Sequence, residues 1–160
     1  MSYRVWYGSS WWRLWRKLVT FLRLSWGDKA LVFEALAWLG WMRLAVLILP
    51  FKNVSAWLGR EGQTTPVEVL DPQQTRFAVR VARAIHRIQP FTPWDSNCLA
   101  QALTARKMLQ RRGIPCTTYL GAAIQDDRSG LVAHAWLRCG PWILTGSIGH
   151  RRYKIVATFA

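Results

Sequence analysis

The chain has 160 residues, enough for one domain or for a small domain with an extension. Its hydrophobic fraction of 51% includes 11 Trp, so material for a core is ample and a low-complexity protein is excluded. The net charge of +14 is spread over much of the chain, which excludes a single basic tail. Such a charge favours an anionic partner, namely an acidic peptide, an acidic protein surface, a membrane surface or nucleic acid.

Three cysteines, Cys98, Cys116 and Cys139, show neither metal-ligand spacing nor an even disulfide set. We therefore expect no metal and no cofactor, and a reducing compartment. The Arg- and Trp-rich N-terminus lacks an uninterrupted apolar stretch before a small-residue cleavage site, so no cleavable signal peptide is predicted. The predicted location is the cytoplasm, with the inner face of the membrane as a place of peripheral association.

Residues 11–24 carry Trp and Leu at helical spacing, with basic residues largely on the other side of the helix. Such a helix can rest on an anionic membrane surface or pack its Trp stripe against the protein. Ser25 or Asp28 can cap a second helix over about 29–49, which ends before Pro50. This second helix is almost wholly apolar.

The second helix approaches the length of a membrane span, which needs about 20 mostly apolar residues. Glu34 and Arg43 lie inside it, however, and two charges cost a few kcal/mol on insertion. We therefore expect it to pack on its neighbours or to lie at an interface rather than to cross a bilayer.

The stretch 59–72 is rich in Gly, Pro and polar residues and is predicted to be a linker. It divides the chain into an N-terminal helical, Trp-rich basic extension (1–58) and a core (73–160). The core pattern predicts helices over about 73–88 and 98–112, the second ended by Gly113, and then strands over 117–124, 131–138, 142–145 and 153–159. Short turns between the strands indicate an antiparallel sheet, so the fold class is α+β.

Two residues of the core are candidates for a catalytic role. Cys98 stands at the start of a predicted helix, where the partial positive charge of the helix terminus favours thiolate. His134 lies on a predicted strand, framed by small residues and Trp136, and can take a proton and return it to a leaving amine. Taken alone, Cys98 could instead be a small buried core residue, and His134 could be a histidine with a purely structural role.

A peptidase also needs donors for the oxyanion of its transition state. The backbone N–H of Cys98 is available by position, and the side chains of Asn97 and Gln101 can add a donor. Trp94 lies in the loop before Cys98, for which the sequence suggests no packing role, and we count it with Trp136 among the candidate substrate-site residues. After the turn that follows His134, the residues expected beside it are Thr145, Gly146 and Ser147, none of them acidic.

These residues resemble the lasso peptide leader peptidases, a bacterial branch of the transglutaminase-like (papain-like) cysteine protease superfamily. The resemblance is carried by Cys98-Leu99-x-Gln101-Ala102-Leu103, Leu109-x-Arg111-Arg112-Gly113-Ile114-Pro115, Leu120-Gly121 and Ala133-His134-Ala135-Trp136. It extends to Phe21-Leu22-Arg23-Leu24 and Leu49-Pro50-Phe51, so nearly the whole chain is covered.

The resemblance implies a transglutaminase-like core of helices plus an antiparallel sheet, with Cys98 as nucleophile and His134 as base. Many relatives carry an Asp after a Leu-Asn pair on the strand that follows the His. Gly146 stands at that position here, so the resemblance implies a dyad whose His is oriented by Thr145 or by a backbone carbonyl.

The implied activity is removal of the leader from a ribosomally made lasso peptide precursor. The chain has no room for the leader-recognition domain of fused relatives, so the implied partners are the precursor leader, a separate leader-recognition protein and the lasso cyclase. The alternative is a catalytically silent scaffold that holds precursor and cyclase at a membrane surface. Nucleic acid is not an expected partner, because the basic residues follow no recognised nucleic-acid module.

Overall fold

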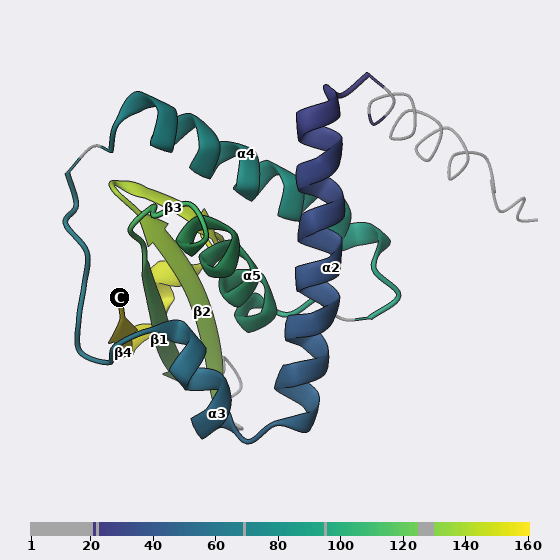
Figure 1. The fold of residues 1–160 in the computed structure, drawn as a ribbon. Helices are drawn as coiled ribbons and strands as arrows, with labels where there is room; N and C mark the ends of the chain where they lie inside the picture. The colour runs from purple at the N-terminus through teal and green to yellow at the C-terminus, as the bar shows by residue number, and fades with distance from the viewer. Residues whose placement is uncertain (1–20, 22, 69, 95, 125–129) are drawn as a thin grey trace, which may run out of the picture.

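The computed structural model describes residue 21 and residues 23–68, 70–94, 96–124 and 130–160 (Figure 1). The helix predicted over 11–24 falls almost entirely outside these residues, so its interpretation stays a prediction.

The long apolar helix α2 spans Trp26–Ile48, close to the predicted range. Ser25 is its cap, because its hydroxyl oxygen accepts a hydrogen bond from the backbone N–H of Asp28 at 3.1 Å. The chain is extended at Leu49, as expected for the residue before Pro50. The short helix α3 (Phe51–Ser55) and the 3₁₀ turn η1 (Ala56–Leu58) follow, and the sequence pattern did not predict either of them.

The two core helices lie where the pattern predicted them. Helix α4 spans Pro72–Ile88, with the carboxylate of Asp71 accepting from the first free N–H groups. A 3₁₀ turn, η2 (Gln89–Phe91), leads into the loop before helix α5, which spans Cys98–Gln110. Gly113 has a φ of +64°, the left-handed conformation that glycine adopts readily after a helix.

The four predicted strands are confirmed: β1 (Thr117–Ile124), β2 (Leu131–Cys139), β3 (Trp142–Thr145) and β4 (Lys154–Phe159), with a 3₁₀ turn η3 (His150–Arg152) before β4. They form one antiparallel sheet in the order β3-β2-β1-β4. The fold is therefore α+β, as predicted.

The helices lie on one face of this sheet, with α5 next to the strands and α2 and α4 on its far side (Figure 1). Ala135, Leu137 and Cys139 of β2 are buried in one hydrophobic cluster with residues of α2, α4 and α5. Because side chains alternate along a strand, these three residues identify the helix-facing side of β2. Helix α2 thus shares a core with the helices of the 73–160 region, and the proposed domain division remains a prediction.

The stretch 59–71 is fastened to the sheet. Gly62 donates its N–H to the carbonyl of Thr158 at 2.8 Å, which continues the sheet beyond β4. The buried guanidinium of Arg138 donates to the carbonyl oxygens of Thr65, at 2.6 Å, and Pro66, at 3.1 Å. This stretch was predicted as a linker, and in the structure it packs along the sheet.

Among the described residues, α2 is the one helix long and apolar enough to cross a membrane. A third of its most apolar window is buried inside the protein, and it packs against α4 and α5. A single such helix near the N-terminus is weak support for a span, since core helices meet the same criterion. Packing on neighbours is what the two charges in the helix led us to expect.

Candidate active site

Cys98 is the first residue of α5 and a free, half-buried thiol. Asn97 caps the helix, because its side-chain Oδ1 accepts from the N–H of Ala100 at 2.9 Å and its carbonyl accepts from the N–H of Gln101 at 3.1 Å. The N–H groups of the first helical turn have no partner within the helix. Cys98 thus stands at the N-terminus of α5, the position in the helix at which the sequence placed it.

The loop before Cys98 is held firmly and does have a packing role, contrary to our expectation. The hydroxyl of Thr92 lies 2.8 Å from Oγ of Ser96, and Nε2 of Gln101 donates to the carbonyl of Ser96 at 2.7 Å. The indole of Trp94 lies against Gly40 of α2, where an added Cβ would come within 3.2 Å of it. Trp94 and Gly40 are far apart in the sequence, so no local sequence pattern predicts that they pack together.

The candidate oxyanion donors differ in whether their N–H groups already have a hydrogen-bond partner. The amide nitrogen of Gln101 is committed to Ser96, and Asn97 acts as the helix cap. Nε1 of Trp94 is buried with no hydrogen-bond partner among the described residues. The buried indole nitrogen of Trp94 is closed to a substrate in this structure, which leaves the backbone N–H of Cys98 as the candidate donor for a developing oxyanion.

His134 lies on β2, opposite Gly121 of β1, with its ring held on three sides. Its Nε2 is 2.8 Å from the carbonyl oxygen of Gly146. Its ring stacks on Tyr153, with centroids 4.8 Å apart, and on Trp136, with centroids 6.0 Å apart. Because a carbonyl oxygen only accepts, Nε2 carries the proton and the neutral ring keeps Nδ1 as its basic nitrogen.

The group that orients His134 is the backbone carbonyl of Gly146, one of the two arrangements left open by the sequence. The hydroxyl of Thr145 is buried and has no hydrogen-bond partner among the described residues. Trp136 is almost fully buried and stacks on Tyr119 at a centroid distance of 5.5 Å, so it frames the imidazole rather than facing substrate. The contribution of Tyr153 was missed, and no feature of the sequence marks that residue.

Within the described residues, which include both Cys98 and His134, no hydrogen bond joins Sγ of Cys98 to the imidazole. Helix α5 packs on the Ala135 and Leu137 side of β2, so alternation turns the side chain of His134 to the other face of the sheet. Strand β3 ends at Thr145, which pairs with Leu137, so no β3 residue pairs with β2 beside His134.

The two remaining cysteines are poor nucleophiles. Burial raises the pKa of the Cys116 thiol. Burial, together with the nearby Cys116 thiol, raises the pKa of Cys139 to about 12. Thiolate is the reactive form, so Cys98 is the thiol best placed to react. Within the described ranges, no group of three or more His, Cys, Asp or Glu side chains is arranged to hold a metal ion.

Comparison with known proteins fits this arrangement of a helix-terminal Cys and a strand His. The family model described as the transglutaminase-like superfamily matches residues 41–158. The chain belongs to the transglutaminase-like superfamily. No curated protein and no solved structure matches it significantly. The match begins inside α2 and includes α4, α5 and nearly the whole sheet, so it covers both members of the candidate pair.

Proposed function

We propose that this transglutaminase-like protein is a cysteine peptidase that removes the leader from a lasso peptide precursor. Cys98 is the nucleophile and His134 the base. The observation that carries the proposal is the hydrogen bond from His134 to the carbonyl of Gly146, because it fixes the tautomer with a basic Nδ1. The partly exposed thiol at the start of α5 supplies the nucleophile.

The reaction has two steps. The Cys98 thiolate attacks the scissile carbonyl, the C–N bond breaks, and the imidazolium of His134 gives its proton to the leaving amine. Water then attacks the thioester as the imidazole takes a proton from it, and the products are a leader carboxylate and the free thiol. The backbone N–H of Cys98 stabilises the oxyanion of both tetrahedral intermediates.

This mechanism requires a rearrangement that can be stated from the structure. No hydrogen bond joins the imidazole of His134 to Sγ of Cys98 among the described residues, so the two groups have to approach each other for the reaction, with Nε2 of His134 keeping its contact with Gly146. Productive geometry in a peptidase is often completed only when substrate binds. We propose that the precursor, presented by a separate leader-recognition protein, drives this movement before the cyclase acts on the new amino terminus.

The proposed location is the cytoplasm. The excess of positive charge fits docking of the leader, the recognition protein or the cyclase through their acidic surfaces. It also fits peripheral contact with the inner face of the membrane.

The test is incubation of precursor and recognition protein with the chain, followed by mass spectrometry. We expect a leader fragment with the native protein and with Cys116→Ala, and none with Cys98→Ala. His134→Gln, which keeps a hydrogen-bonding side chain, should leave only residual cleavage. Equal cleavage by the Cys98→Ala variant would refute the peptidase.

A second function, that of a catalytically silent scaffold for precursor and cyclase, is favoured by two observations. No hydrogen bond joins the thiol and the imidazole among the described residues, and Gly146 stands where the resemblance implies an acid. A scaffold would increase cyclised product in the presence of pre-cleaved precursor and cyclase, and Cys98→Ala would act as well as the native chain. A peptidase adds nothing once the leader has been removed.

A further inference from the structure

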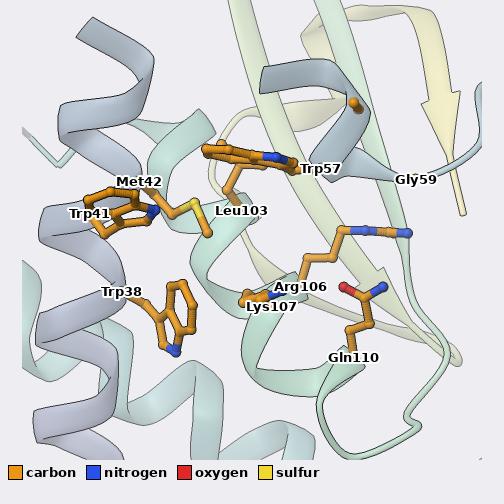
Figure 2. Close-up of a pocket in the computed structure, with 10 residues that line it drawn as sticks. Trp38, Trp41, Met42, Trp57, Gly59, Leu103, Arg106, Lys107 and Gln110 are labelled. Atoms are coloured by element: carbon orange, nitrogen blue, oxygen red, sulfur yellow. The ribbon is translucent and has the colours of Figure 1, made fainter. Parts of the chain in front are cut away.

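A cavity of about 430 Å³ lies between α2, η1 and the second half of α5. Figure 2 shows indole side chains from α2 and η1 on one side of this cavity and polar side chains of α5 on the other. The indoles are those of Trp38, Trp41 and Trp57, and the polar groups are those of Arg106, Lys107 and Gln110. We call this cavity the indole pocket.

The polar side of the indole pocket carries two cationic side chains, Arg106 and Lys107. Arg106 is 7% exposed, and its Nε is buried with no hydrogen-bond partner among the described residues. One of its terminal nitrogens donates to the carbonyl of Cys116 at 3.3 Å, which holds the guanidinium in place. Nζ of Lys107 lies 5.7 Å from the ring centre of Trp38. Among the described residues no Asp or Glu lines the pocket, and the end of the Arg106 guanidinium lies near the main chain of Ala160, since both would crowd a Cβ on Gly59.

A buried charge with an unused donor is costly unless a partner supplies an acceptor. The two cations make the pocket unsuited to a cationic ligand, in spite of its three indoles. The chemistry that fits is an apolar body that carries or adjoins a carboxylate. Trp41 and Leu44 of α2 are half exposed next to each other along that helix, so the apolar surface extends beyond the pocket mouth.

We propose that the indole pocket is a docking site for an acidic peptide segment. One large apolar side chain of the peptide enters between the indoles, and a neighbouring Asp or Glu pairs with Arg106 and Lys107. A peptide is favoured because the apolar surface beside the pocket offers contacts for the residues that follow. The site is independent of Cys98 and His134, since Lys107 lies nine residues along α5 from Cys98, or about 13 Å at the rise of an α-helix.

The test uses three fluorescein-labelled hexapeptides and the full chain, with binding read by fluorescence anisotropy. The first peptide is Glu-Asp-Leu-Phe-Asp-Glu. The second replaces its acids with Gln and Asn, and the third replaces Leu-Phe with Ala-Ala. We expect the first to bind at least about tenfold more tightly than either of the others, a difference of about 1.4 kcal/mol.

Two variants locate the site. Lys107→Glu should weaken binding of the first peptide by about tenfold or more, because it reverses a charge within the pocket. Trp57→Ala removes one wall of the pocket and should weaken binding similarly, with the circular dichroism spectrum unchanged. Lys154→Glu makes the same change of charge on exposed β4, away from the pocket, and should bind as the native chain does.

Three results would overturn the proposal. Equal binding of the acidic and neutral peptides would remove the role of Arg106 and Lys107. An equal loss for Lys107→Glu and Lys154→Glu would show attraction by net charge alone. Complete displacement of the peptide by phosphatidylglycerol vesicles, with vesicle binding lost in Lys107→Glu, would assign the pocket to a membrane surface. None of these results bears on cleavage by Cys98, which the mass spectrometry tests separately.

Discussion

The imidazole of His134 donates to the backbone carbonyl of Gly146, with 2.8 Å between Nε2 and the oxygen. A neutral carbonyl fixes the ring and its tautomer, but it stabilises an imidazolium less than an ionised carboxylate would. His134 thus has an orienting hydrogen bond whose acceptor carries no charge.

The backbone at Gly146 does not accept a side chain without strain. Its φ is +69°, and an added Cβ would collide with the carbonyl oxygen of Ala135 and come within 2.9 Å of Cβ of Trp136. We therefore expect Gly146→Ala and Gly146→Asp both to lower the free energy of unfolding by more than about 1 kcal/mol. Urea denaturation measures the change, and exposed Gly130→Ala, where a Cβ meets nothing, is the control. A Gly146→Asp protein as stable as the native one would contradict this reading.

Local signals accounted for most of the fold. Ser25 and Asn97 cap helices where a short polar side chain precedes an apolar run, and Pro50 ends α2 as its fixed backbone dictates. The side to which His134 points was not predictable in this way. Strand β2 buries Ala135 and Leu137 on one face and Trp136 and Arg138 on the other, so alternation of hydrophobicity does not identify the helix-facing side.

The three thiols should differ sharply in reactivity. Cys98 is half exposed, whereas burial raises the pKa of both Cys116 and Cys139. Iodoacetamide at neutral pH should therefore modify Cys98 first, with the other two modified only as the protein unfolds. Peptide mapping by mass spectrometry identifies the modified residue. Equal labelling of all three thiols in the native protein would show that Cys98 has no special environment.

Alkaline pH should weaken the fold through Cys139. The ordinary pKa of a thiol is 9.0, and in the folded protein that of Cys139 is about 12. The unfolded chain loses this proton first, so the free energy of unfolding falls as the pH rises from about 9 toward about 12 and is unaffected by this thiol below that range. Urea denaturation across this range tests the prediction. Cys139→Ala should be less stable but should show a shallower pH dependence, and an identical slope would exclude Cys139 as the cause.

Arg138 should be essential for holding the 59–71 stretch against the sheet. Its guanidinium donates to the carbonyls of Thr65, Pro66 and Gly140, a set that the single ammonium of Lys cannot reach together. Arg138→Lys should cost roughly 2–4 kcal/mol of stability and make this stretch cleavable by protease. Arg83→Lys, an exposed change on α4, should alter neither property. If Arg138→Lys leaves cleavage of the stretch unchanged, other contacts hold it.

Gly121 leaves room for the aromatic stack around the imidazole of His134. It pairs with His134, and an added Cβ would come within 2.8 Å of the Trp136 ring and of Cβ of Tyr153, the two side chains that stack on that imidazole. Gly121→Ala should therefore displace the stack and lower kcat by about tenfold or more, with little change in KM, because a misplaced base affects the transition state rather than binding. Gly62→Ala, where a Cβ meets open space, controls for loss of a glycine. A rise in KM alone would instead indicate that this stack belongs to substrate binding.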